Sequence, residues 1–262
     1  MNDASLDAAD AQLTGWADPV ARLRQAIDKD EFTLYCQPIL GLAAGDYPLG
    51  EILVRMREEE SALLPPGAFL PVLKHYRMLA QLDRWVVRNA LQALAAGLRI
   101  PRLSVNVSEQ TLADGDFPAY VATQLAEHAI APDRLLFEID ESDVLGGPAA
   151  TTAFAAACRK LGVGVMIDGF GRRAVSFSVI KGVAADFVKV DGIVTRKILA
   201  NDAARNKMDA VVRVSETLRF AVIAECVEEE DVLMQLQAMR VGYAQGFGVY
   251  KPFPIERFAR EG

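Results

Sequence analysis

The sequence reads LLFEIDES at residues 135–142, VGVMID at residues 163–168 and DFVKVD at residues 186–191. Each stretch is a short run of apolar, often β-branched residues that ends on charged residues. The residues between them, 149–161 and 175–180, have the spacing of amphipathic helices. Strands that alternate with helices in this way predict parallel pairing through right-handed crossovers.

The same alternation continues on both sides of this central stretch. Further strand-like runs lie at residues 32–40, 50–55, 103–107, 221–224 and 242–244, and further helical stretches at 79–95, 119–128, 203–218 and 229–239. Eight such strands can close into a barrel. The connection Gly41–Leu49 is rich in turn residues and too short for a crossover helix. We therefore expect a modified TIM-type (βα)8 barrel of the α/β class, with its first strand antiparallel to the second.

Length and composition favour one globular domain. The chain has 262 residues, of which 52% are hydrophobic and 24% charged. Asp18 and Pro19 are typical of a helix start, so we expect a helix up to about Ile27. Residues 1–17 are interpreted as a disordered leader or an expression remnant, and residues 18–262 as a single barrel domain.

Charge, cysteines and hydropathy exclude several classes of protein. The net charge of −7 disfavours a nucleic acid polymer as partner, because such binding depends on neutralised phosphates. Cys36, Cys158 and Cys226 have no metal-binding spacing and are expected to be buried thiols in a reducing compartment. No signal peptide or membrane span is predicted, which favours a cytoplasmic location unless the chain is part of a larger anchored protein.

Polar residues stand at unusual places inside or directly after the apolar strands. Carboxylates in such surroundings are costly unless they are paired or bind metal. Scattered salt bridges would explain one or two of them, but a shared pocket explains the whole set better. Oxygen donors of this kind suit Mg²⁺ or Mn²⁺, and no histidine or cysteine accompanies them to recruit zinc. The set is Glu51, Asn106, Glu138, Asp140, Asp168, Lys189, Asp191, Glu225 and Gln245.

Eight motifs together resemble the EAL domain family, whose members are phosphodiesterases that open cyclic di-GMP to linear pGpG. They are LYCQPI, LDRWV, LSVNVS, FEIDES, IDGFG, FVKVD, IAECVE and AQGFGVYKP, in the order of the family and spanning about Leu23 to Phe253. The segment that gives the family its name reads EILVR here, at residues 51–55. The resemblance implies a modified (βα)8 barrel with its first strand reversed.

The resemblance also implies roles for individual residues. Glu51, Asn106, Glu138 and Asp168 match the ligands of one Mg²⁺ or Mn²⁺ ion, and Lys189 matches a lysine near the attacking water. Glu225 and Glu228 match two glutamates of the seventh-strand motif, and Gln245 matches a glutamine of the last strand. On the ligand side, Arg55 resembles a phosphate-contacting arginine, Gln37, Leu53 and Asp83 resemble residues lining a guanine site, and Phe247 and Pro252 resemble base-packing residues.

The sequence departs from the family where a second metal would bind. The family has two adjacent aspartates, but this chain reads Asp168-Gly169, and the following loop T-G-Y-S-S is replaced by residues 172–176, RRAVS. Two compensations are open: Asp140 supplies a replacement oxygen, or Arg172 or Arg173 turns inward and pairs with Asp168 or Glu141. Otherwise these arginines are solvated. Cys226 stands in place of a glycine and Ile52 in place of an alanine, which we interpret as packing changes.

Three functions follow as hypotheses. The first is a degenerate EAL domain that binds cyclic di-GMP, hydrolyses it little or not at all, and reports occupancy to a protein partner. The second is a slow metal-dependent phosphodiesterase that gives pGpG. The third is a protein-interaction module that does not bind nucleotide. The resemblance is compatible with a homodimer, although the altered loop lies where the family forms its dimer contact.

Overall fold

The computed structural model describes residues 16–58, 62–172 and 177–256. Most of the expected leader, residues 1–15, therefore lies outside the described residues. The strands are β1 (Phe32–Gly41), β2 (Leu49–Glu58), β3 (Ala62–Leu64), β4 (Arg102–Asn106), β5 (Leu135–Asp140), β6 (Gly164–Phe170), β7 (Phe187–Val190), β8 (Ala221–Ala224), β9 (Tyr243–Ala244) and β10 (Phe253–Pro254).

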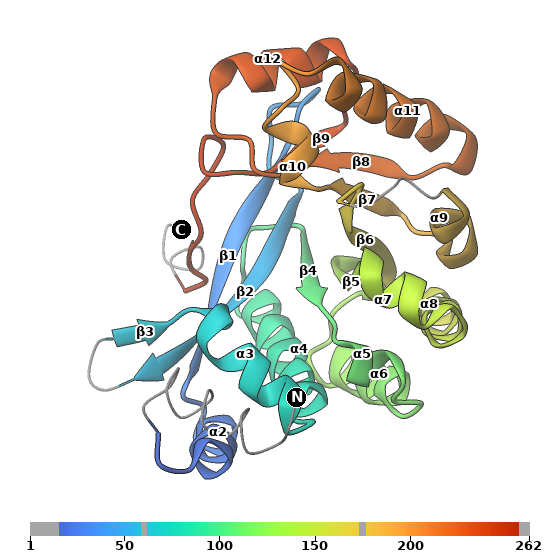
Figure 1. Cartoon of the computed structure of the whole chain (residues 1–262). Helices are drawn as coiled ribbons and strands as arrows, with labels where there is room; N and C mark the ends of the chain where they lie inside the picture. Colours follow the sequence, from blue (N-terminus) through green and yellow to red (C-terminus); the bar gives the residue numbers. More distant parts are fainter. Residues whose placement is uncertain (1–15, 59–61, 173–176, 257–262) are drawn as a thin grey trace.

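Helices cover the outside of the strands (Figure 1). They are α2 (Pro19–Asp28), α3 (Pro66–His75), α4 (Leu79–Ala95), α5 (Glu109–Leu112), α6 (Phe117–Glu127), α7 (Glu141–Gly146), α8 (Pro148–Leu161), α9 (Phe177–Val183), α10 (Gly192–Thr195), α11 (Asp202–Leu218) and α12 (Glu230–Ala238). The expected start of α2 is confirmed, since the Asp18 side chain accepts a hydrogen bond from the amide of Ala21 at 3.0 Å.

The sheet closes into a barrel, as the alternation of strands and helices predicts. From β2 through β4 to β9, neighbouring strands pair in parallel. Strand β1 pairs antiparallel with β2 on one side and with β9 on the other, which closes the barrel. The prediction of a modified (βα)8 barrel with a reversed first strand is confirmed.

The barrel interior is apolar on one level and polar on the next. A small buried cluster fills the lower level and consists of Ile39, Leu49, Leu136, Met166, Phe187 and Ile223, with Tyr243 packed against it. Side chains of a strand alternate between its two faces, so the residue two positions along points inward as well. Each of these seven residues has a polar residue two positions away on the same strand or just after its end. Taken in the same order, the polar residues are Gln37, Glu51, Glu138, Asp168, Lys189, Glu225 and Gln245. The alternation therefore places the polar residues together above an apolar floor.

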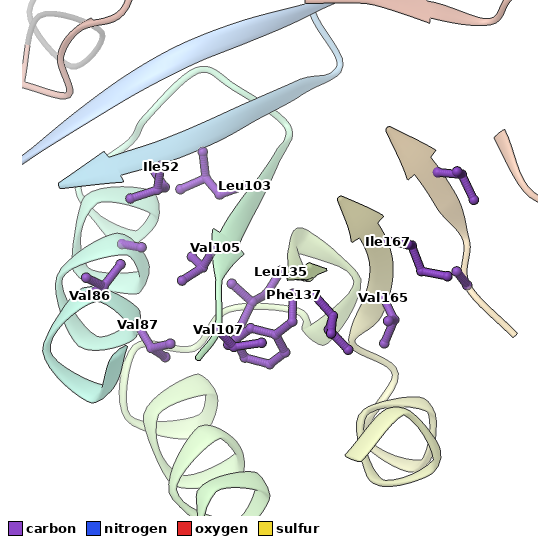
Figure 2. Close-up of a cluster of buried hydrophobic side chains, with 14 of the residues drawn as sticks. Ile52, Val86, Val87, Leu103, Val105, Val107, Leu135, Phe137, Val165 and Ile167 are labelled. Atoms are coloured by element: carbon purple, nitrogen blue, oxygen red, sulfur yellow. The ribbon is translucent and has the colours of Figure 1, made fainter. Parts of the chain in front are cut away.

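The main core lies between the outer face of the barrel and its helices. Figure 2 shows part of it, where Val86 and Val87 of α4 face Ile52, Leu103 and Val105 of β2 and β4. Within the described residues, no helix is both long and apolar enough to cross a membrane.

Several elements were not predicted from the sequence, among them the short helices α5, α7 and α10, the strands β3 and β10, and helix α3. Strands β3 and β10 are short and add to the edges of β2 and β1, so they carry no long alternating pattern. Helix α3 begins with prolines at positions 65 and 66 and contains Pro71, which together are typical of a loop. Pro65 and Pro66 are tolerated because the first turn of a helix needs no amide donor there.

Strand β6 contains an irregularity directly after Asp168. The pairing of β6 with β7 shifts between Ile167 and Phe170, and Gly169 has a φ of +66°, in the left-handed region that favours glycine. The chain at residue 169 is therefore bent in a way that other residues adopt only with strain.

Gly50 offers a test of packing at the junction of β1 and β2. A Cβ atom at residue 50 would lie 2.5 Å from Cys36 Sγ and 3.2 Å from Ile100 Cδ1. We expect Gly50→Ala to lower the free energy of unfolding by about 1–3 kcal/mol through overpacking, measured by urea denaturation. Gly67→Ala, with nothing within 4 Å of its new methyl group, is the matched control. Equal effects of the two substitutions would contradict this account, whereas partial recovery in Cys36→Ala/Gly50→Ala would support it.

Candidate functional site

Lys189 lies at the centre of the polar level of the barrel. Its ammonium group is 2.9 Å from Glu51 Oε2 and 2.8 Å from Glu138 Oε2, and its side chain is only 1% exposed. Asp168 Oδ1 and Glu225 Oε1 lie further out, at 3.4 Å and 3.3 Å from the same nitrogen. One buried cation thus joins four carboxyl groups from four strands or strand ends.

This arrangement shifts the pKa values of its members in different directions. Burial raises the pKa of Glu138, and that of Glu225, to about 8, although the charge of Lys189 opposes the shift. Burial would also raise the pKa of Glu51, but the charge and hydrogen bond of Lys189 hold it below its usual value. Burial would lower the pKa of Lys189, yet the surrounding carboxylates raise it well above its usual value. The charged form of the lysine and the ionised form of Glu51 are thus favoured, whereas burial favours the protonated forms of Glu138 and Glu225.

Glu51 is further fixed by two amide side chains. Asn106 Nδ2 donates to Glu51 Oε1 at 2.9 Å, and Gln245 Nε2 donates to Glu51 Oε2 at 2.7 Å. Gln245 Nε2 also donates to Gln37 Oε1 at 3.1 Å, and Gln37 Nε2 donates to the carbonyl oxygen of Tyr250 at 3.0 Å. The strands β1, β2, β4 and the end of β9 are thereby connected through their inward side chains.

The donor set suits one divalent cation, although its oxygens now surround an ammonium group. Buried oxygens of Glu138, Asp168 and Gln245 have no hydrogen-bond partner, and oxygen ligands of this type are those that Mg²⁺ and Mn²⁺ prefer. In the described ranges, no group of three or more acidic, histidine or cysteine side chains is gathered as a metal site. An ion at this position would compete with Lys189 for the carboxylates.

Residue 169 offers no side-chain donor, and the space that a side chain there would need is occupied. A Cβ atom on Gly169 would lie 2.6 Å from Arg172 Nη2 and 3.0 Å from Arg172 Cζ. The guanidinium group is held there by Asp191 Oδ2, at 2.8 Å from Nε, and by Asp140 Oδ2, at 3.2 Å from Nη1. These contacts raise the pKa of Arg172 above its usual value.

The two compensations that the sequence left open have different outcomes. Arg172 turns over Gly169, but it pairs with Asp140 and Asp191, so the alternative in which this arginine pairs with Asp168 or Glu141 is wrong. Asp140 accepts hydrogen bonds from the amide and hydroxyl of Ser142 at the start of α7, so its oxygens are engaged there and with Arg172. Arg173, the other candidate, lies outside the described residues.

A first cavity, of about 630 Å³, lies beside the polar cluster between β2, α3 and α4. Leu53, Asp83 and Asn106 line it. Asp83 is buried, and its Oδ2 accepts from Ser108 N at 2.9 Å, Ser108 Oγ at 2.7 Å and Thr111 Oγ1 at 2.6 Å. Burial raises the pKa of Asp83 in spite of these hydrogen bonds. The carboxyl group is thus rigidly oriented at the edge of a largely apolar cavity.

A second cavity, of about 200 Å³, lies on the other side of Glu51. Among its lining residues are Gln37, Glu225, Glu228, Gln245 and Phe247. Phe247 is 60% exposed, which is unusual for a large apolar side chain. Gln37 therefore lies with Phe247 in this cavity, while Leu53 and Asp83 line the other one. Pro252 is half-buried and is not among the residues that line either cavity.

Sequence reasoning missed two residues beside these cavities. Tyr35 lies opposite Leu53 in the β1–β2 pairing, and the Arg55 guanidinium is 5.4 Å from the centre of its ring. Arg196, just after α10, lines the second cavity. The antiparallel pairing of β1 with β2 would have pointed to Tyr35, but nothing in the sequence around Arg196 distinguishes it from other surface arginines.

Comparison with known proteins identifies the family. The profile of a family described as the EAL domain matches residues 20–252. The chain belongs to the EAL domain family. The cyclic di-GMP phosphodiesterase PdeF of Escherichia coli (strain K12) is 31% identical over 237 residues, or 89% of this chain and 32% of PdeF. NbdA of Pseudomonas aeruginosa (strain PAO1), also a cyclic di-GMP phosphodiesterase, is 31% identical over 245 residues, or 91% of this chain and 31% of NbdA. This EAL domain spans about a third of the length of these relatives.

Solved structures of EAL proteins have the same fold. The PaMucR phosphodiesterase in complex with c-di-GMP has a TM-score of 0.84 and 26% identity, covering 91% of this chain and 98% of that one. The FimX EAL domain from Pseudomonas aeruginosa bound to c-di-GMP has a TM-score of 0.84 and 25% identity, covering 90% and 96%. This EAL domain is thus related both to cyclic di-GMP phosphodiesterases and to structures that hold the nucleotide.

The raised pKa of Glu225 predicts how the stability of this EAL domain depends on pH. Because that pKa, about 8, exceeds the ordinary value of 4.5, the stability that the group contributes is present below pH 4.5 and lost as the pH rises through 8. In chelator, we expect the melting temperature of Glu225→Gln, relative to wild type, to increase between pH 5 and pH 8. Glu229→Gln, at an exposed position, should show no such trend. A difference between Glu225→Gln and wild type that does not change with pH would contradict the assignment.

Proposed function

We propose that this EAL domain binds cyclic di-GMP and hydrolyses it slowly or not at all. One observation carries the proposal: at residue 169 the chain has a glycine in a left-handed conformation, and the Arg172 guanidinium fills the space that a side chain there would need. A domain of this kind acts as a receptor, whose occupancy is reported to another part of the protein or to a partner.

The loss of the second metal ion would lower the rate of phosphodiester hydrolysis. Glu51, Asn106, Glu138 and Asp168 would hold one Mg²⁺ or Mn²⁺ ion, and a divalent cation there supplies charge to polarise a phosphodiester. Two-metal hydrolysis shares that task between two ions. Removing a charge-stabilising group costs roughly 3–4 kcal/mol in comparable sites, so the loss of both the second ion and the water it helps to activate predicts a rate about 10⁴-fold lower.

Binding depends on a different set of residues. Arg55 is supported by the Tyr35 ring, and a guanidinium group pairs well with a phosphate. Asp83 presents a fixed carboxyl group at the edge of the first cavity, where it can accept hydrogen bonds from guanine N1 and N2. Phe247 offers an exposed ring beside the second cavity. None of these residues touches the position that Arg172 fills.

The first test measures binding and turnover separately. We expect calorimetry to detect cyclic di-GMP binding in chelator as well as in Mg²⁺, and chromatography to detect little or no pGpG with Mg²⁺ or Mn²⁺. Binding that is absent in both conditions would favour a nucleotide-independent interaction module. Rapid pGpG formation that is abolished by Glu51→Ala would show instead that the domain is an active phosphodiesterase.

A gain-of-function pair tests why turnover is low. Gly169→Asp alone places a carboxyl group against the Arg172 guanidinium, so we expect no gain in activity. Gly169→Asp/Arg172→Thr removes that guanidinium and restores an oxygen donor. We expect pGpG formation in Mn²⁺ to rise at least about 100-fold over wild type, a part of the 10⁴-fold deficit. If the double variant folds, binds Mn²⁺ and remains as inactive as wild type, the missing donor is not the cause.

Asp83 allows a test of nucleotide recognition. Asp83→Asn replaces a carboxylate that can accept two hydrogen bonds from a guanine by an amide that cannot, so we expect the dissociation constant for cyclic di-GMP to increase at least about tenfold. Thr111→Val removes one donor to Asp83 without changing the cavity wall, and it should affect melting temperature more than affinity. Equal losses of affinity in the two variants would mean that Asp83 acts only on structure.

A further inference from the structure

The second cavity has an unusual distribution of charge. Three carboxyl groups line it, from Glu51, Glu225 and Glu228, and Arg196 is the one arginine or lysine among the described lining residues. Within the described ranges, the Arg196 side chain makes no hydrogen bond or ion pair, although acidic residues stand on the same wall. An arginine with five free donors at a cavity of this kind is suited to a ligand that presents acceptors.

The backbone beneath Arg196 explains its position. A Cβ atom on Gly192 would lie 3.4 Å from Arg196 Cζ and 2.5 Å from Cys226 Sγ. Cys226 itself has a φ of +56°, in the left-handed region. The absence of a side chain at residue 192 therefore makes room for both Cys226 and Arg196 at the cavity wall.

We infer that Arg196 reads the O6 and N7 edge of a guanine base that lies in the second cavity against Phe247. The inference rests on the proposed function, since it takes cyclic di-GMP as the ligand. The cavity, at about 200 Å³, is smaller than sites that enclose a whole drug-sized ligand and suits one flat base. Phe247 supplies an exposed aromatic face on which such a base stacks.

The chemistry of the lining matches guanine and excludes adenine. Arginine pairs in a bidentate manner with the two acceptors O6 and N7 of guanine. The opposite edge of guanine carries the N1 and N2 donors, which suit a carboxylate such as that of Glu228. Adenine has a donor at position 6 and an acceptor at N1, so it would place a donor against Arg196 and an acceptor against the acidic wall. Arg196 is therefore a specificity-determining residue for the second base.

The test compares ligands that differ at single atoms. We would titrate wild type, Arg196→Ala and Arg196→Lys with cyclic di-GMP, with its 7-deazaguanine analogue, which lacks the N7 acceptor, and with cyclic di-AMP. Lys197→Ala removes a neighbouring exposed cation that does not line the cavity and serves as the matched control. Melting temperatures without ligand confirm that each variant is folded.

We expect wild type and the Arg196 variants to differ in how strongly their affinity depends on the N7 atom of guanine. Wild type and Lys197→Ala should bind the 7-deaza analogue about tenfold more weakly than cyclic di-GMP, whereas Arg196→Ala should bind the two ligands equally. Arg196→Lys should lose most of the discrimination, because lysine lacks the planar fork. Discrimination against cyclic di-AMP should also decrease in Arg196→Ala.

Two failures can be told apart. If wild type does not bind cyclic di-GMP at all, the proposed function is wrong, and the inference about Arg196 is overturned with it. If wild type binds but Arg196→Ala retains the full preference for N7, the proposed function stands and the inference is wrong. If Arg196→Ala binds cyclic di-GMP and its 7-deaza analogue more weakly by the same factor, Arg196 contacts the phosphate. That result would also overturn the inference that Arg196 recognises the guanine base.

Discussion

The buried contact between Lys189 and its four carboxyl groups is the interaction on which the rest of the site depends. It joins residues from β2, β5, β6 and β7 with Glu225 at the end of β8. Desolvating any one of these charges alone would be costly. The cost is reduced because one ammonium group contacts several carboxyl groups, and because burial shifts Glu138 and Glu225 toward their protonated, uncharged forms. The same groups that could bind a cation thus stabilise the barrel without one.

The backbone directly after β6 places an arginine over a glycine. Gly169 is bent by a β-bulge, and Arg172 returns over it to bridge Asp140 and Asp191. A fixed positive charge therefore stands just after β6, where it pairs with Asp140, the last residue of β5, and with Asp191, which follows β7. A metal ion comes and goes with its concentration, but an arginine is part of the chain. The positive charge of Arg172 at this position therefore does not depend on a bound ion.

The sequence predicted the barrel and most of its polar residues because both follow from alternation. Once the strands are placed, Met166 and Asp168, or Phe187 and Lys189, must share a face. Features that depend on tertiary packing could not be predicted from this alternation. The side chain of Arg172 could point in several directions, and only its contact with two strand ends chooses between them. The position of Arg196 at the cavity wall depends on a bare backbone at Gly192, which no local pattern reveals.

The division into two cavities has a mechanical consequence. One cavity is built mainly from β2, α3 and α4, and the other from residues of β1 and β2 together with residues around α10, β8 and β9. The second cavity therefore spans the seam of the barrel, where β1 meets β9 through two residue pairs, Leu40–Ala244 and Gly41–Tyr243. A molecule that fills the second cavity would contact residues on both sides of this short junction. Amide hydrogens of β1 and β9 should then exchange with solvent more slowly in the occupied state, and that stiffening is a signal which an attached domain can sense.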